Sequence, residues 1–415
     1  MNASISILCH TLSGNAFGRA WVLAELLRRD FDVHVVAACR PGDEIWAPVR
    51  TSCAFEIRCH TQWSYAGFRF RAPRVADQLV TGQLIYAVKP RLASFGLGLV
   101  ARQRAPRPLL LDIDDWEVGF SPLWQDVLFA PWALLSSASG LHTRLLSARS
   151  AEADAITVSS SFLHRLYGGS WIPHVRDGAL FTGRSRDLSA RYGEAVQGPT
   201  RPRGSLRSRR STSQASDGAD KTVVFIGTPR KHKGLGDLLQ AFQRVSAPAR
   251  LRIIGGALDA GLVRQARALG DARISIEPPV PMAALPALLA SADVVVIPQD
   301  RSRVSEAQLP AKLLDAMAMG RAIVSTKVGD IPRWLEGGAG VVVEPGDVPA
   351  LGAAIDSLLR DARARRAMGE RARERFVALA ALETVRPRLV VLVEQLLRGE
   401  SPTLIPPFED ARSGR

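Results

Sequence analysis

The stretch VVVIPQDRSRVSEAQLPAKLLDAMAMGRAIV, residues 294–324, decides the fold of this chain. Its apolar runs 294–297 and 322–324 predict two buried strands, and the segment between them has the periodicity of a helix. Pro310 lies where that helix begins, because a first-turn N–H has no partner in any case, and Gly320 lies where it ends. A strand, a helix and a second strand in this order predict a parallel α/β sheet.

The same alternation extends in both directions along the 415 residues, a length that suits two to three domains. The apolar runs expected to form further buried strands are 4–9, 33–38, 84–88, 109–113, 155–158, 223–226, 251–254, 274–276 and 341–343. Helices on both faces of each sheet would bury these strands. The predicted fold is therefore α/β, with two Rossmann-like, doubly wound parallel-sheet domains that face a cleft.

A composition change separates the two halves. Residues 197–220 are rich in arginine, serine and proline and almost free of apolar side chains, which predicts a flexible basic segment. The last apolar period follows Pro387, a residue suited to a helix start, and predicts a helix that packs back on the first domain. The expected parts are a first domain 1–180, a linker 181–220, a second domain 221–385, and a terminal helix with a loose tail 386–415.

The chain is basic, with a formal net charge of +14, which fits phosphorylated substrates, nucleic acid or an anionic membrane. We expect no nucleic-acid partner, because no helix-turn-helix, zinc-finger or aromatic-basic motif is present. No apolar run reaches the roughly 20 residues of a membrane span. Residues 122–146 are either a core helix, which we favour, or a membrane-facing amphipathic helix. We expect a cytoplasmic protein, either free or in peripheral contact with the anionic inner face of the membrane.

A glycine followed by cations indicates a phosphate site in the second half. One predicted strand runs into Gly227, and the loop after it carries Arg230, Lys231 and Lys233 before a helix begins near Gly234. Ligands bind beyond the carboxyl ends of parallel strands, and helix N-termini attract phosphate. The pattern favours a diphosphate, although a solvated basic turn would look the same.

A cation and a carboxylate follow a later strand of the same predicted sheet. Lys312 and Asp315 are three residues apart, so they share a helix face. Together they suit a ligand with both phosphate and hydroxyl groups, such as a nucleotide sugar. Because both motifs follow strands of one sheet, we expect Lys312 and Lys233 at the same edge.

These two motifs resemble the nucleotide-binding domain of retaining glycosyltransferases of family 4, which have the GT-B fold. The resemblance implies that Lys233 is the family's phosphate-binding lysine. Thr228 stands where many members have a phosphate-binding arginine, so Arg230 is its expected substitute. Asp315 takes the place of the acidic residue that holds the ribose hydroxyls. The resemblance also implies that no metal is needed.

The usual pair of glutamates is incomplete in this chain. Ala307 stands eight positions before Asp315, where the family has a sugar-contacting glutamate, and Glu306 is beside it. Either Glu306 is displaced by one position or that glutamate is missing. Members with a Pro-x-Lys in this helix often lack it, and Pro310-Ala311-Lys312 has that form. Lys312 is then expected to contact the diphosphate or the sugar.

The first half carries weaker motifs. Gly14 and Asn15 open a glycine-containing turn after the first strand, similar to the family loop that closes over donor phosphates. Asp114 ends another strand, where such carboxylates serve in proton transfer or metal binding. It falls near the place of the family's sugar-site histidine, although helix capping would also explain it. His174 is a candidate sugar or acceptor contact, or else a structural histidine.

The resemblance implies transfer of a sugar from a nucleoside diphosphate sugar to an acceptor hydroxyl on a glycan, a lipid-linked acceptor or a small molecule, with retention and without a cofactor. The expected catalytic residues are Lys233, Arg230, Lys312 and Asp114. The expected donor-binding residues are Gly14, Asn15, Gly227, Thr228, Lys233, Glu306, Pro310, Lys312 and Asp315. The alternatives are a GT-B sugar-nucleotide epimerase, a basic nucleic-acid-binding protein and a non-catalytic transferase homologue.

Overall fold

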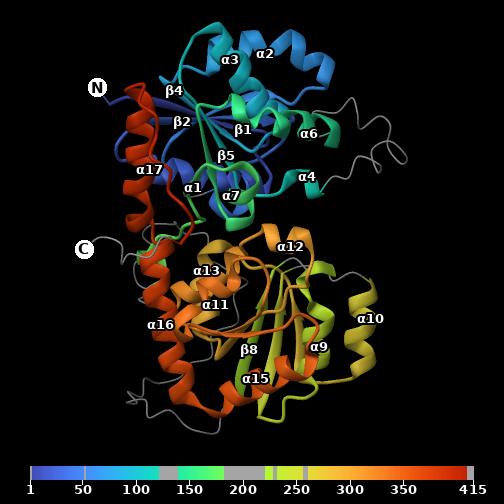
Figure 1. Ribbon diagram of the computed structural model, residues 1–415. Helices are drawn as coiled ribbons and strands as arrows, with labels where there is room; N and C mark the ends of the chain where they lie inside the picture. The colour runs from blue at the N-terminus through green and yellow to red at the C-terminus, as the bar shows by residue number, and fades with distance from the viewer. Residues whose placement is uncertain are drawn as a thin grey trace, which may run out of the picture.

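The first strand of each half opens a separate parallel sheet, and the two sheets belong to two domains stacked one above the other (Figure 1). The computed structural model describes residues 2–50, 53–120, 139–181, 220–227, 231–255 and 260–408. The predicted linker, apart from its two end residues, lies outside the described residues. So do Thr228, Arg230 and most of segment 122–146.

Within the described residues, the first sheet has seven parallel strands in the order β3-β2-β1-β4-β5-β6-β7. The strands are β1 Ser4–Cys9, β2 Asp32–Cys39, β3 Glu56–Thr61, β4 Leu84–Val88, β5 Leu109–Ile113, β6 Ala155–Val158 and β7 Ser170–Trp171. In register, Ile5 of β1 pairs with Val33 on one side and with Leu84 on the other. The order reverses beside β1, so the loops after β1 and β4 leave the sheet where ligands commonly bind.

Helices cover both faces of this sheet. They are α1 Asn15–Leu27, α2 Tyr65–Leu79, α3 Leu97–Arg104, α4 Glu117–Phe120, α6 Gly140–Ala148 and α7 Ser161–Tyr167. The shorter turns are η1 Ala47–Val49, η2 Leu92–Gly96, η4 Ser150–Glu152 and η5 Gly178–Phe181. The turn expected to open at Gly14 and Asn15 is already the start of α1, since Gly14 is its N-cap.

The second sheet has six parallel strands among the described residues, in the order β10-β9-β8-β11-β12-β13. They are β8 Lys221–Ile226, β9 Ala249–Ile254, β10 Ile274–Glu277, β11 Val294–Ile297, β12 Ala322–Thr326 and β13 Val341–Val343. The helices are η6 Lys231–Lys233, α9 Leu235–Phe242, α10 Ala260–Leu269, η7 Met282–Ala284, α11 Leu285–Ala290, α12 Arg303–Ala307, α13 Ala311–Ala318, α14 Ile331–Trp334, η8 Glu336–Gly338, α15 Val348–Arg360, α16 Ala362–Ala380 and α17 Leu382–Leu397. The predicted architecture of two doubly wound parallel-sheet domains is confirmed.

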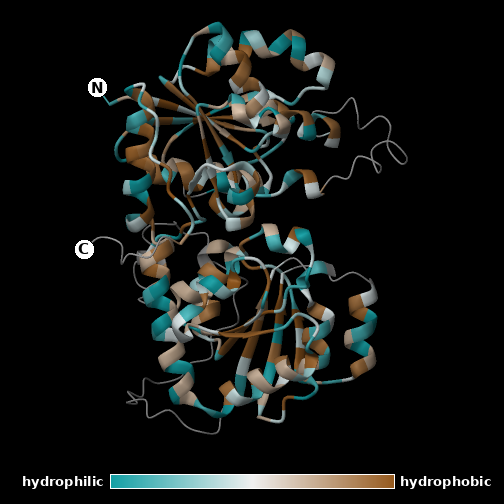
Figure 2. Ribbon diagram, viewed as in Figure 1, coloured by the Kyte–Doolittle hydropathy of each residue, from teal (hydrophilic) through white to brown (hydrophobic). Residues whose placement is uncertain are grey.

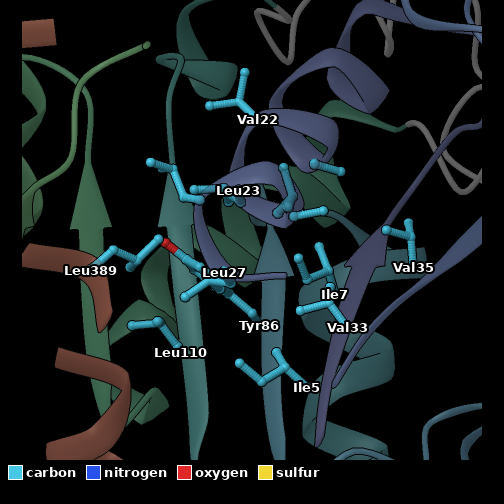
Figure 3. Close-up of a cluster of buried hydrophobic side chains, with 14 of the residues drawn as sticks. Ile5, Ile7, Val22, Leu23, Leu27, Val33, Val35, Tyr86, Leu110 and Leu389 are labelled. Carbon is cyan, nitrogen blue, oxygen red and sulfur yellow. The ribbon is translucent and has the colours of Figure 1, made fainter. Parts of the chain in front are cut away.

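Apolar strands form the centre of both domains, as the brown sheets of Figure 2 show. In the first domain, Leu27 of α1 and Tyr86 of β4 belong to one buried cluster with Leu389 of α17 (Figure 3). The last helix of the chain therefore completes the core of the first domain. It begins at Leu382 rather than after Pro387, which lies inside it. Packing of its apolar face on α1 outweighs the local preference of proline for a helix start.

Two passages of the chain between the domains lie side by side. The segment after β7 leads toward the second domain, and α16 continues into α17, which returns to the first (Figure 1). Arg176 N donates to the Ala380 carbonyl at 3.1 Å, and Leu382 N donates to the Arg176 carbonyl at 3.1 Å. These bonds fasten the two crossings to each other. No helix in the described ranges is both long and apolar enough to cross a bilayer.

A buried ion pair connects three elements of the first domain. Arg19 of α1 binds Asp112 of β5 through Nε at 2.9 Å and Nη2 at 2.7 Å. Its remaining N–H groups donate to the carbonyls of Ile172 at 2.8 Å and Pro173 at 3.0 Å. Both charged side chains are fully buried, so the pair persists only because each polar atom has a partner.

Replacing Arg19 with methionine leaves the Asp112 carboxylate buried and unpaired. We expect Arg19→Met to lower the free energy of unfolding of the first domain by about 3–5 kcal/mol. Urea unfolding followed by tryptophan fluorescence measures this loss. Arg104→Met is the matched control, because Arg104 pairs with Asp77 at the exposed surface, and its midpoint should stay near that of the wild type. Equal midpoints for the two variants would contradict the assigned role of Arg19.

Candidate functional site

A cavity of about 660 Å³ lies between the domains. Lys233, Lys312 and Gln308 line what we call its basic end. Trp21, Val22, Trp46, Pro48, Val49, Met282 and Pro286 line what we call its tryptophan arm. In the arm, the Trp46 ring packs so closely on Gly18 of α1 that a Cβ added to Gly18 would meet the ring. The turn η1 also contacts η7 across the domain boundary.

The basic end is built at the carboxyl ends of β8 and β11, which are neighbours in the second sheet. Gly227 follows β8 with φ +139°, and Pro310 precedes α13 after β11. The side chain of Lys312 lies directly against Gly227, where an added Cβ would overlap its ammonium group. Lys233 Nζ lies 3.4 Å from Gln308 Oε1. The structure thus brings together the two lysines that the sequence placed at one sheet edge.

Gly234 determines how the β8 loop enters its helix. It is the N-cap of α9 with φ +63°, a conformation that side-chain-bearing residues rarely adopt. A Cβ at this position would also overlap the Pro298 carbonyl. The close approach constrains the backbone at Gly234, and Lys233, the residue before it, lines the cavity.

An acidic cluster around one lysine faces the basic end from the first domain. Lys89 follows β4, is buried and has φ +69°. Its Nζ lies 2.7 Å from Asp115 Oδ2, 2.7 Å from Glu117 Oε1 and 3.3 Å from Asp114 Oδ1. Arg91 also pairs with Glu117. The cluster fixes the loop after β5, and Asp114 and Asp115 line the cavity.

The two neighbouring aspartates have opposite pKa shifts. Burial raises the pKa of Asp114 to about 7, although Lys89 opposes the rise. Burial would also raise the pKa of Asp115, but Lys89 and the hydrogen bond from Gln308 lower it to about 2. Asp114 Oδ1 is buried and, within the described residues, has only the ionic contact with Lys89 Nζ at 3.3 Å and no hydrogen bond. Asp115 is therefore a fixed anion, whereas Asp114 changes its charge near neutral pH.

Gln308 connects the acidic cluster with the basic end across the domain boundary. Its Nε2 donates to Asp115 Oδ1 at 3.0 Å, while its Oε1 faces Lys233. Nearby, Ser160 Oγ donates to the Ala307 carbonyl at 3.0 Å. The two domains are in direct contact around the cavity in this arrangement.

The remaining predicted residues differ in their relation to the cavity. Asn15 and Pro310 line it, whereas Gly14 caps α1 beside it. Glu306 is half-buried in α12 and is not among the lining residues. His174 lines the cavity, and burial together with Arg19 and Arg176 lowers the pKa of His174 to about 3. It is therefore a neutral imidazole at physiological pH.

Asp315 is not one of the residues that line the cavity. The carboxylate is buried, and Arg176 Nε donates to its Oδ1 at 2.6 Å. Arg176 itself lines the cavity. The contact of Asp315 with ribose hydroxyls stays a prediction.

The sequence analysis missed Lys89, Arg19 and Gln308. Lys89 follows the apolar run 84–88, so its place at a strand end was a usable signal. Arg19 interrupts an otherwise apolar helix face, and an arginine there requires a buried partner. Gln308 gives no local signal. Within the described residues, no group of three or more histidine, cysteine, aspartate or glutamate side chains is arranged to hold a metal ion.

Comparisons with known proteins agree with this geometry. Residues 220–361 match the family model "Glycosyl transferases group 1". The chain is 29% identical over 189 residues to N-acetyl-alpha-D-glucosaminyl L-malate synthase of Bacillus anthracis, covering 44% of this chain and 47% of that protein. It is 30% identical over 189 residues to D-inositol 3-phosphate glycosyltransferase of Corynebacterium urealyticum, covering 42% and 43%. The matches thus span less than half the length of these curated relatives.

A solved structure extends the likeness to both domains. Anabaena HepE, determined in complex with UDP and glucose, superposes with a TM-score of 0.66 at 16% identity, covering 95% of this chain and all of that one. At this identity the superposition speaks for the fold alone. Residues 220–361 are thus similar to the group 1 glycosyltransferases, and the chain as a whole has the GT-B fold.

Proposed function

We propose that this protein transfers a sugar from a nucleoside diphosphate sugar to an acceptor hydroxyl, with retention at the anomeric carbon. The observation that carries the proposal is that Lys233 and Lys312 line one cavity at adjacent strand ends, with Lys312 against Gly227. The group 1 glycosyltransferase match covers this site. The names of the curated relatives favour transfer over epimerisation.

In this reaction the basic end would stabilise the leaving diphosphate. Negative charge develops on that group as the bond to the sugar breaks, and two ammonium groups held in a partly dry cavity offset it. Asn15, at the start of α1, and the loop containing Thr228 and Arg230 are the proposed further contacts with the donor. Gln308 would hold Lys233 in place by joining it to the first domain when the domains are in contact.

Asp114 is proposed to receive a hydrogen bond from the incoming acceptor hydroxyl. Asp114 lines the cavity, and within the described residues its Oδ1 has only the ionic contact with Lys89 Nζ at 3.3 Å, so the carboxylate has capacity for a hydroxyl donor. When Asp114 is ionised, neither carboxylate oxygen carries a proton, so both can accept a hydrogen bond. Asp115 is committed to Lys89 and Gln308, so it is not the candidate.

The proposed peripheral contact with an anionic membrane has a candidate surface on α2. Phe70 is 84% exposed and lies opposite the buried face of that helix. Arg69, Arg71 and Arg74 are exposed around it, and within the described residues none of the three forms an ion pair. An aromatic side chain surrounded by cations suits the headgroup region of an anionic bilayer.

Replacing Lys233 with alanine tests the basic end. We expect Lys233→Ala to lower kcat for donor-dependent transfer or donor hydrolysis about a hundredfold or more, as with loss of one transition-state donor. Lys327→Ala is the matched control, because Lys327 is a surface lysine of the same domain paired with Glu344. Near-normal turnover by a correctly folded Lys233→Ala protein would contradict the proposed phosphate site.

The raised pKa of Asp114 predicts a pH dependence. Below about pH 7 the side chain is protonated in the folded protein, and above it the carboxylate is available to the acceptor. We therefore expect kcat to rise with pH through about 7 and then level. In Asp114→Asn this rise should disappear along with most of the activity, whereas Glu44→Gln, at the exposed surface, should keep it. An unchanged profile in Asp114→Asn would rule out this role.

Vesicle co-sedimentation tests the α2 surface. Vesicles of phosphatidylglycerol and phosphatidylcholine should bind the protein, and those of phosphatidylcholine alone should not. Phe70→Ser should weaken binding about tenfold, because it removes one buried aromatic side chain. Leu404→Ser, another exposed apolar position, should have no effect. Binding that is equal in the two variants would place the membrane contact elsewhere.

A further inference from the structure

We infer that the tryptophan arm of the cavity binds a neutral carbohydrate as the acceptor and selects against anionic acceptors. The inference rests on the proposed function, because it assigns the acceptor class of the same site. It depends on three features of the arm and its surroundings: two tryptophan side chains, two carboxylates in the cavity lining, and arginines that are already paired with carboxylates.

The tryptophans supply flat apolar surface. Trp21 projects from α1, and Trp46 precedes η1 and packs on Gly18. Both side chains are partly exposed and line the cavity, with Met282 and Pro286 of the second domain among the other lining residues. Small-molecule sites combine such apolar walls with a few polar groups that fix orientation. A sugar ring offers both an apolar C–H face and hydroxyl groups.

Two carboxylates are part of the cavity lining, those of Asp114 and Glu25. Asp114 Oδ1 lies 3.3 Å from Lys89 Nζ, and Glu25 Oε2 accepts a hydrogen bond from Arg28 at 2.8 Å, so each carboxylate has capacity for a further donor. Hydroxyl groups can donate to a carboxylate. The oxygens of a carboxylate or phosphate ligand cannot donate, and they would be repelled.

The arginines around the arm are matched to carboxylates of the protein. Each of the four that line the cavity forms an ion pair, and the pairs are Arg19 with Asp112 at 2.7 Å, Arg28 with Glu25 at 2.8 Å, Arg29 with Glu383 at 2.9 Å and Arg176 with Asp315 at 2.6 Å. An anionic acceptor would have to break one of these pairs and leave a carboxylate without its partner. Such a mismatch is a means of rejecting the wrong ligand.

This arrangement separates the chain from two of its relatives by acceptor chemistry. Their names contain L-malate and D-inositol 3-phosphate, which are both anions. The ion pair Arg28–Glu25 would determine whether an anionic acceptor can bind in this chain. Removing the carboxylate of Glu25 would release a cation at the cavity wall without altering the basic end.

Saturation-transfer NMR on the full chain tests the inference directly. The probes are maltose and methyl α-D-mannoside as neutral sugars, and L-malate and inositol 3-phosphate as anions. We expect transfer to at least one neutral sugar and to neither anion, and a loss of about tenfold in sugar affinity in Trp46→Ala. Anions that bind as well as the sugars, or sugars that do not bind, would overturn the inference.

A charge-release variant sharpens the test. Glu25→Gln should shift the ratio of anion to sugar binding about tenfold toward the anions, because Arg28 loses its partner. Glu44→Gln is the matched control, since it releases Arg50 at the surface outside the cavity lining. An unchanged ratio in Glu25→Gln would contradict selection by this ion pair.

Nucleotide binding separates failure of this inference from failure of the proposed function. UDP, GDP, ADP, CDP and dTDP are screened by thermal shift with the wild type and Lys233→Ala. Stabilisation of the wild type alone by one of these nucleotides, with no sugar bound, would leave the proposed function standing and overturn the acceptor class. Absence of stabilisation by all of them would remove the proposed function itself, and the acceptor class with it.

Discussion

The buried pair of Arg19 and Asp112 determines where the groups of the first domain face the cavity. A guanidinium and a carboxylate without water persist only if every polar atom is bonded, and here the carbonyls of Ile172 and Pro173 complete the set. The pair therefore fixes α1, the end of β5 and the segment that leaves the first domain. Asp114 is two residues beyond one of these anchors, and His174 directly follows another.

The sequence was sufficient for the architecture because parallel strands buried on both faces are short continuous apolar runs. The runs at 84–88, 109–113 and 294–297 match β4, β5 and β11 residue for residue. The run EIRCHT of β3 was missed, since β3 is at the edge of its sheet and carries few apolar residues. The start of α17 was misplaced because contacts with α1, remote in sequence, outweigh the local signal of Pro387.

The site residues that follow the ends of strands could be predicted from the sequence. The residues placed by ion pairs or hydrogen bonds with distant parts of the chain could not. Lys233 and Lys312 follow neighbouring strands, so topology alone brings them together. The partners of Lys89 lie 26 and 28 residues along the chain, and Gln308 reaches across 193 residues to Asp115. Asp315 illustrates the same limit, because its local motif gives no sign that Arg176 occupies one of its oxygens.

The paired crossings of the chain join the two domains at one residue. Arg176 is hydrogen-bonded through its backbone to both Ala380 and Leu382, so the outgoing and the returning segments are tied together there. The side chain of the same residue binds Asp315 of the second domain. A change of backbone position at Arg176 would therefore act on both chain crossings and on a buried carboxylate of the second domain at once.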